Sequence, residues 1–343
     1  MTETAIPSHA RPFPKRTALL VGMILAMAVM IFGPAWAGFP ARLASFAGLV
    51  WAAALLLEGR ARYFFNGPAA YLAAGSLAIL VLLALFATEL SPQNPYDLAQ
   101  LDIMDGRLAP GGTNFDGTFT YRLGTDEQGR DILSGILYGL RVSLSVAILA
   151  TAVAMAIGVV VGIYAAWAGG RVEAILMRLV DLQLSFPSIL VALMLMAAFG
   201  RGLDKVVIAL IVVQWAYYAR TVRGTALAET QKDYIDAARG LGLSSMRILF
   251  RHLLPNCIPP LLVISTVQIA NTIVLESSLS FLGVGVPITR PSLGLLIANG
   301  YDYMLSGQYW MSMYPGVALL AIVASINLVG DRLRDSLNPR LRR

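Results

Sequence analysis

Charged residues are scarce in this sequence, and their scarcity decides the class of protein. Asp, Glu, Lys and Arg make up 13% of the 343 residues, whereas hydrophobic residues make up 57%. A soluble domain carries about 25% charged residues, so the composition indicates an integral membrane protein in contact with the lipid bilayer. The net charge of +6 does not indicate nucleic-acid binding, because the basic residues lie in short segments between apolar runs.

Cysteine and histidine are scarcer still. Cys257 is the single cysteine, so no intrachain disulfide can form, and His9 and His252 cannot assemble a metal site with plausible spacing. The sequence has no Gly-x-x-x-x-Gly-Lys-Ser/Thr motif to hold ATP phosphates. It also lacks Gly-x-Ser-x-Gly, His-Glu-x-x-His and a paired-carboxylate site. We therefore expect a chain without catalytic residues, metal or cofactor of its own.

Apolar runs of helical length predict an all-α protein with about eight transmembrane helices. The first run could instead be a signal peptide cleaved after Ala35-Trp36-Ala37. The first two runs are near the lower length limit for a spanning helix, so a re-entrant hairpin is a second alternative. The runs cover residues 17–37, 41–57, 69–88, 141–167, 184–200, 205–224, 257–284 and 313–330.

The distribution of charge predicts the orientation. Residues 91–139 hold seven acids and three bases, a net charge of −4, whereas residues 220–255 hold six bases and three acids, a net charge of +3. Because Lys and Arg gather in cytoplasmic loops, we expect 220–255 inside and 89–139 outside. The basic tail, 331–343, is then cytoplasmic. Three spans before residue 89 place the basic N-terminus, 1–16, inside as well, which favours an uncleaved first span.

The segment 229–255 is the longest charged connection in the second half of the chain, and its pattern predicts two short helices joined by a turn. In the first, at 231–241, Ile235, Ala238 and Leu241 fall on one helical face. Gly240 and Gly242 bracket its end, where a positive φ is favoured. The second is predicted to start with Ser244 as N-cap and to carry apolar residues up to Pro255, which ends it or leads into the next span. By itself this segment could be an ordinary amphipathic loop.

Short motifs in this segment resemble the "EAA" signature of binding-protein-dependent ABC importer permeases. The resemblance rests on Asp236-Ala237-Ala238, Gly242 and Leu254-Pro255. Asp236 stands where that family often has Glu, and His252 stands where the general signature has Ile, a departure that the peptide-transporting branch shares. In that family the elbow is the coupling helix, which docks on a cytoplasmic ATPase. The resemblance implies ATPase coupling by Asp233, Tyr234, Asp236, Ala237, Ala238, Gly242 and Leu243.

Two further stretches resemble the dipeptide/oligopeptide/nickel branch of these permeases. Residues 123–131, continuing to 138–144, look like its Gly-Thr-Asp…Gly-Arg-Asp stretch, and residues 291–294, 314–316 and 327–340 resemble its second permease subunit. The resemblance covers about 90–343. In the first stretch, Asp126, Arg130 and Asp131 could form a structural cap at a helix entrance or contact an external substrate-binding protein.

Polar side chains form a stripe within the predicted span 257–284. Ser265, Gln268, Thr272, Glu276 and Ser280 follow at spacings of three or four and share a helical face. A carboxylate at such depth normally faces a bundle interior or a watery cavity. The first four are therefore candidates for the translocation path, although Glu276 could instead be protonated, hydrogen-bonded between helices or close to the interface. Gly158 and Gly162 form a Gly-x-x-x-Gly pair, a helix-packing signal.

The resemblance implies a type I ABC importer permease fold with extra N-terminal spans, in the bacterial inner membrane. Implied partners are a homologous permease, two ATPase subunits that supply ATP and Mg, and a binding protein. Peptides are the expected cargo; nickel chelate, glutathione and opine are alternatives. A stand-alone channel or secondary transporter would need no ATPase. A membrane enzyme would need convergent titratable groups at one depth, and only Glu276 is clearly intramembrane. The expected divisions are 1–16, 17–68 (extra spans), 69–139 (first core span and external loop), 140–330 (transmembrane domain) and 331–343.

Overall fold

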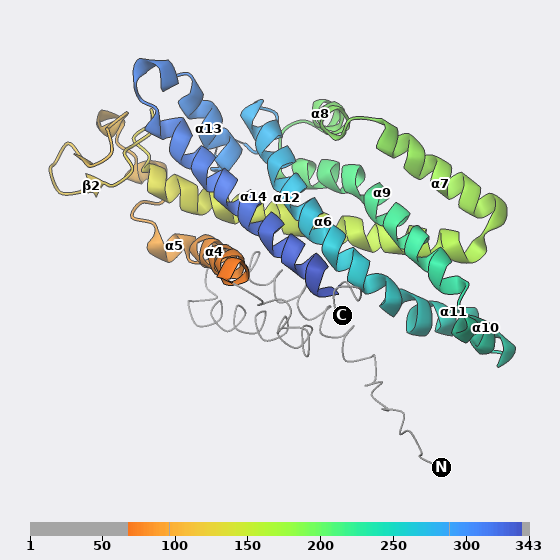
Figure 1. Ribbon diagram of the computed structural model, residues 1–343. Coiled ribbons are helices and arrows are strands. Elements are labelled where there is room, and N and C mark those ends of the chain that lie inside the picture. The colour runs from red at the N-terminus through yellow and green to blue at the C-terminus, as the bar shows by residue number, and fades with distance from the viewer. Residues whose placement is uncertain (1–67, 96, 288, 338–343) are drawn as a thin grey trace, which may run out of the picture.

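The computed structural model describes residues 68–337, apart from residues 96 and 288, and forms a bundle of long helices (Figure 1). Five helical stretches in this part are long and apolar enough to cross a membrane, and a bent pair makes up to six. The predicted all-α architecture is therefore confirmed for this part. The predicted runs at 17–37 and 41–57 and the residues after 337 lie outside the described residues. The five stretches are Pro68–Leu85, Ile132–Ala168, Leu203–Thr230, Ser245–Phe281 and Trp310–Leu337.

The centre of the bundle is the close pairing of α6 (Ile132–Ala168) with α9 (Leu203–Thr230). A Cβ added to Gly158 would lie 2.4 Å from the Cβ of Tyr218, and one added to Gly162 would lie 2.6 Å from the carbonyl oxygen of Ala219. The two helix backbones can approach this closely only because both positions lack a side chain. The predicted packing role of the Gly-x-x-x-Gly pair is confirmed.

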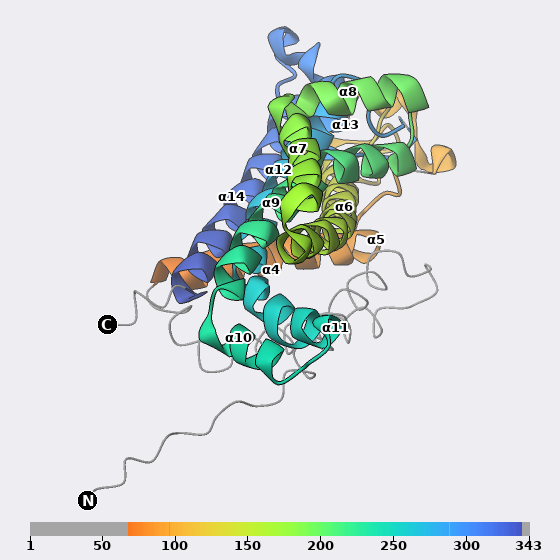
Figure 2. The ribbon, with the colours of Figure 1, turned by 90° about the vertical axis from the view of Figure 1, so that its right-hand side faces the viewer.

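The predicted continuous span at 184–200 is wrong. The chain forms α7 (Gly170–Ser185) and α8 (Ser188–Phe199), which meet at an angle of 90°. Pro187 explains the break, because proline lacks an N–H and disfavours helical geometry in the residue before it. Phe186 is accordingly extended, with φ −92° and ψ 139°. Figure 2 shows α8 lying across the end of α7.

The second half of the bundle consists of α12 and α14 with the short α13 beside them. A four-residue helix, α11 (Ser245–Ile248), continues through a π-helical turn, η3 (Leu249–Leu253), into α12 (Leu254–Phe281). After α13 (Leu293–Tyr301) and η4 (Met304–Ser306), α14 (Trp310–Leu337) returns along α12. On the other side, α4 (Pro68–Leu85) packs on α14 and leads into α5 (Ala87–Leu90).

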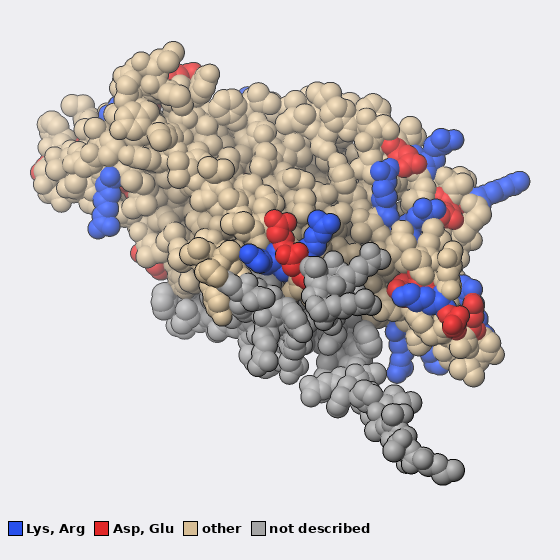
Figure 3. Space-filling model, viewed as in Figure 1, with Lys and Arg blue, Asp and Glu red and all other residues tan. Residues whose placement is uncertain are grey.

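The connections with most polar residues lie at opposite ends of the bundle (Figure 1). One end holds the loop between α5 and α6, with η1 (Leu98–Gln100), η2 (Ile103–Asp105) and the antiparallel strands β1 (Gly112–Thr113) and β2 (Thr120–Tyr121). The other end holds α10 (Asp233–Gly240) and α11, which we call the elbow. Figure 3 shows charged side chains crowded around the elbow end, a second charged group near the end of α14, and a broad uncharged area over the upper part of the helices.

Candidate functional site

The turn of the elbow is a helix C-cap built on one glycine. Gly242 has φ +70°, as predicted. Its N–H donates to the carbonyl of Arg239 at 2.9 Å, and the N–H of Leu243 donates to the carbonyl of Ala238 at 3.2 Å. These two bonds form a Schellman motif, in which a left-handed residue satisfies the last carbonyls of a helix. The angle at which the chain leaves α10 therefore depends on Gly242.

The elbow has a small apolar core of its own. Ile235, Ala238 and Ile248 are buried together, with Leu243 packed beside them and Trp167 reaching in from the end of α6. Ala238 is thus covered inside the elbow, where its small side chain allows the two helices to approach. The prediction that Leu241 shares this face is wrong: Leu241 is 80% exposed. It is the C-cap of α10, so the chain has already left the helical path there.

The start of the second helix is only partly as predicted. Ser244 occupies the N-cap position of α11, but its side chain makes no capping hydrogen bond. Of the two alternatives for Pro255, the second is confirmed: α11 runs without interruption through η3 into α12, and Pro255 leads into this span. The second half of the predicted helix-turn-helix is therefore the first turns of α12 itself. Any displacement of α11 acts directly on the long helix.

Tyr234 ties the elbow to both neighbouring long helices. Its hydroxyl donates to Oε2 of Glu229, at the end of α9, at 2.6 Å. It also accepts from Nδ2 of Asn256, at the start of α12, at 3.0 Å. Burial and the Glu229 carboxylate raise the pKa of Tyr234 to about 12, so the hydroxyl keeps its proton at neutral pH. Tyr234 thus joins three elements with one polar atom.

The outer face of the elbow is partly apolar, which motif reading missed. Leu241, Met246 and Phe250 are 80%, 66% and 63% exposed. Asp236 is also exposed, and its Oδ1 lies 3.5 Å from Nη1 of Arg239. These exposed apolar side chains lie at the turn after α10 and in the first turns of the stretch Ser245–Phe281, where the chain leaves the elbow for the long helix. Their presence in a charged segment was a signal in the sequence, but helical spacing assigned Leu241 to the core.

The stripe along α12 faces the neighbouring helices. Glu276 is fully buried, and its carboxylate oxygens accept from the hydroxyls of Ser143 on α6 and Ser280 on α12, both at 2.8 Å. This is the inter-helix hydrogen bonding that the sequence left open as an alternative for Glu276. Ser265 is half-buried, and its hydroxyl donates to the carbonyl of Leu261 at 2.7 Å.

A second part of the stripe borders a hollow on the side of the bundle. The hollow measures about 350 Å³ and is lined by Gln214, Gln268, Asn271 and Thr272, among others. Nε2 of Gln214 donates to Oγ1 of Thr272, so α9 and α12 share a polar contact there. On α6, the hydroxyl of Thr151 donates to Oε1 of Gln214, with an Oγ1–Oε1 distance of 3.3 Å. Asn271 and Thr151 were not predicted, because their roles depend on the pairing of the helices.

Two of the predicted loop residues hold the entrance of α6. The Asp131 carboxylate accepts from the N–H and the hydroxyl of Ser134, at 2.8 and 2.6 Å, and so caps the helix. Oδ1 of Asp126 accepts from the N–H groups of Gln128 and Arg130, at 2.8 and 2.9 Å. Burial raises the pKa of the Asp126 carboxyl above its usual range. Both aspartates form structural caps, whereas the Arg130 side chain is not part of them.

A family model matches residues 158–343, which include the elbow and the polar stripe: the binding-protein-dependent transport system inner membrane component. The chain belongs to this family. A putative peptide transport system permease protein of Brucella suis is 39% identical over 264 residues, covering 77% of this chain and 86% of the relative. The dipeptide transport system permease protein DppC of Escherichia coli K12 is 36% identical over 280 residues, covering 82% and 92%.

Among solved structures, this permease is similar to a chain of the MetNI methionine ABC transporter in an inward-facing conformation. The identity is 22%, the TM-score is 0.48, and the match covers 60% of this permease and 96% of that chain. The predicted membership of the binding-protein-dependent permease family is thus confirmed by the family model and by relatives matched over most of their length.

Proposed function

We propose that this permease is one transmembrane subunit of an ABC importer for peptides, and that it performs no catalysis itself. The observation that carries the proposal is the elbow, which combines the family motif with an exposed apolar face and a direct connection to α9 and α12. Relatives named as peptide or dipeptide permeases support the substrate class. Nickel chelates, glutathione and opines are the alternative cargoes of the same machinery.

The elbow is the proposed contact for a cytoplasmic ATPase, with one ATPase subunit for each permease. Leu241, Met246 and Phe250 supply apolar area, while Asp233 and Asp236 supply negative charge at its rim. Ala237 is exposed beside them and lets a partner approach the helix closely. ATP and Mg bind to the partner ATPases in this scheme.

A second, homologous permease is the proposed cover for the hollow beside α9 and α12. Asn271 is exposed there, and Gln268 and Thr272 line the same hollow. Polar groups at membrane depth face a protein interior or water rather than lipid. A homologous chain that presents its own polar face would enclose a translocation path between the two. Glu276 and Ser265 lie on the same stripe and would support that wall.

The orientation follows from the charges of the two ends. The elbow end carries the basic connection, so we place it and both termini in the cytoplasm, with the loop between α5 and α6 outside. An external substrate-binding protein would then dock at the loop end. In this arrangement cargo is delivered at one end and ATP-driven movement enters at the other.

Reconstitution of the complete complex in proteoliposomes tests the proposal. The permease, its homologous partner, both ATPases and the binding protein should together give peptide uptake that needs ATP. Leaving out the ATPases should abolish uptake. Uptake by this permease alone, driven by an ion gradient or by none, would instead identify a secondary transporter or a channel.

A further inference from the structure

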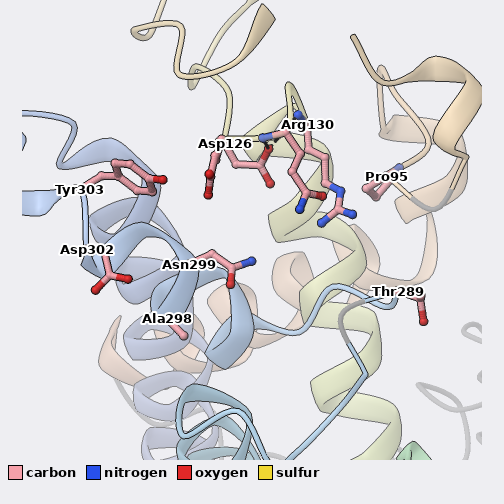
Figure 4. A pocket seen from close by; sticks show the side chains of 10 residues that line it. Pro95, Asp126, Arg130, Thr289, Ala298, Asn299, Asp302 and Tyr303 are labelled. Carbon is pink, nitrogen blue, oxygen red and sulfur yellow. Dashed lines mark hydrogen bonds between the residues drawn. The ribbon is translucent and has the colours of Figure 1, made fainter. Parts of the chain in front are cut away.

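A pocket lies at the loop end, away from the elbow and from the hollow beside α12. It measures about 540 Å³ and lies between the turn before α6 and the end of α13 (Figure 4). Pockets for small molecules usually measure about 300–1,000 Å³. Its lining includes both charge signs and several polar groups: Asp126, Glu127, Gln128, Arg130, Asn299, Asp302 and Tyr303.

Arg130 lines this pocket, and its charge acts on the Asp126 carboxylate without forming an ion pair with it. Its Nε is buried and has no hydrogen-bond partner, and the guanidinium forms no ion pair with any described residue. Figure 4 shows the guanidinium group reaching into the space bordered by Asn299 and Thr289. Nε itself is closed off from solvent, so a ligand in the pocket would meet the outer nitrogens of the guanidinium, which form no ion pair with a described residue.

The turn that carries Arg130 is fixed by close backbone contact. Gly129 has φ +74°, and a Cβ there would lie 2.0 Å from the carbonyl oxygen of Asp102. The N–H of Arg130 is held by Oδ1 of Asp126. The start of the arginine side chain is therefore positioned before any ligand arrives. Such pre-organisation reduces the entropy lost on binding.

Carboxylates line other parts of the same pocket. Asp126, Glu127 and Asp302 contribute negative charge, and the ring of Tyr303 lies 5.5 Å from the guanidinium carbon of Arg107. A ligand with a single negative charge would meet Arg130 but also these three acids. A zwitterion satisfies both signs, because its carboxylate can pair with the guanidinium while its ammonium group pairs with the acids.

We infer that this pocket is an outer binding site for a short peptide zwitterion, with Arg130 binding the terminal carboxylate. The inference rests on the proposed function for its ligand class. It adds a site on the permease itself, separate from the hollow between α9 and α12. A peptide released at the loop end would meet this site before it enters the bundle.

The test uses the full complex in nanodiscs, without the binding protein, and dialanine as the probe. Saturation-transfer NMR should detect dialanine binding to the wild type. Arg130→Gln should weaken it about tenfold or more, because a charged hydrogen-bond pair is lost. Arg122→Gln is the matched control, since Arg122 is an exposed arginine of the same loop outside this pocket. Arg122→Gln should bind like the wild type.

Two modified probes check each end of the ligand. Dialanine amide should lose the contribution of Arg130 and bind equally to the wild type and Arg130→Gln. N-acetyl-dialanine should bind less tightly than dialanine to both. A thermal melt of each variant shows whether it is folded, and Asn299→Ala provides a second variant that leaves the turn intact.

Three results would overturn the inference. The first is equal dialanine binding by wild type and Arg130→Gln, and the second is no binding to the wild type at all. The third is loss of binding-protein affinity in Arg130→Gln without dialanine binding, which would assign the pocket to an acidic side chain of that partner. Peptide uptake by the wild-type system, measured separately with the binding protein present, distinguishes these failures from failure of the proposed function.

Discussion

Replacing Gly242 should uncouple the permease from its ATPase while leaving the bundle intact. The residue has φ +70°, a conformation that costs an L-residue about 1–2 kcal/mol. A Cβ built there would meet no atom within 4 Å, so backbone strain is the whole cost for alanine. A β-branched valine adds to that strain, to a total of about 1–3 kcal/mol.

This cost is large for the elbow and small for the bundle. The elbow is held by its own small cluster around Ile235, Ala238 and Ile248, separate from the clusters that pack the long helices. A penalty of about 1.4 kcal/mol lowers the population of the native turn roughly tenfold relative to an alternative turn. The exposed Leu241 would then be misplaced, whereas the pairing of α6 with α9 would not change.

The assay is ATP hydrolysis by the reconstituted complex, stimulated by peptide and binding protein. Stimulation should fall in the order Gly, Asn, Ala, Val at residue 242, because Asn tolerates the left-handed region better than Ala. Gly240→Ala is the matched control: Gly240 is helical, and its Cβ would also meet nothing within 4 Å. That change should be neutral or stabilise α10 by up to about 1 kcal/mol.

Wild-type stimulation in Gly242→Val would refute the reasoning, since the turn would then be unnecessary for coupling. Equal damage from Gly240→Ala would also refute it, because strain at a positive φ could not be the cause. Loss of the permease from the membrane in Gly242→Val, but not in Gly242→Asn, would mean that the turn is needed for folding of the whole chain.

Three further changes test other contacts. Tyr234→Phe removes the hydroxyl that joins α9 to α12, so peptide-stimulated ATP hydrolysis should fall while basal hydrolysis and melting temperature change little. Gly158→Leu should prevent recovery of folded permease in size-exclusion chromatography, because its Cβ would overlap α9, whereas Gly75→Leu, with open space around its Cβ, should be tolerated. Glu276→Ala should lower the melting temperature by leaving hydroxyls unpaired, at about 1–3 kcal/mol, whereas Glu276→Gln should keep the complex assembled.

Features governed by nearby residues were predictable from the sequence. The positive φ of Gly242 follows from a helix that must stop before another begins. The close approach at Gly158 follows from small residues spaced four apart in an apolar run. The cap at Asp131 follows from an aspartate directly before a helix. For Gly242 and Asp131 the deciding atoms lie within one or two turns of the residue, whereas at Gly158 the glycine spacing predicted a close helix contact but not that α9 makes it.

Features governed by distant residues were not predictable. The inter-helix partner of Glu276 is Ser143, 133 positions earlier. The spacing of polar residues along α12 therefore could not show whether Glu276 lines a translocation path or bonds to another helix. The outer pocket combines Arg130 with Asn299, which meet only after α13 folds back on the loop. The bend at Pro187 was missed because the apolar run continues through it, although proline was the available signal.

Tyr234 and Gln214 connect the elbow to the polar hollow beside α9 and α12. Tyr234 binds the end of α9 through Glu229, and Gln214 lies fifteen residues earlier on the same helix, roughly 22 Å away at 1.5 Å per residue. Gln214 in turn donates to Thr272 on α12, the helix that begins at the elbow. The elbow and the polar hollow are therefore joined twice, once along each helix. If α9 and α12 move together, the contact between Gln214 and Thr272 is kept and the hollow keeps its shape. If only one of the two helices moves, that contact breaks. Gln214→Leu, which removes that contact without touching the elbow, separates these two kinds of movement.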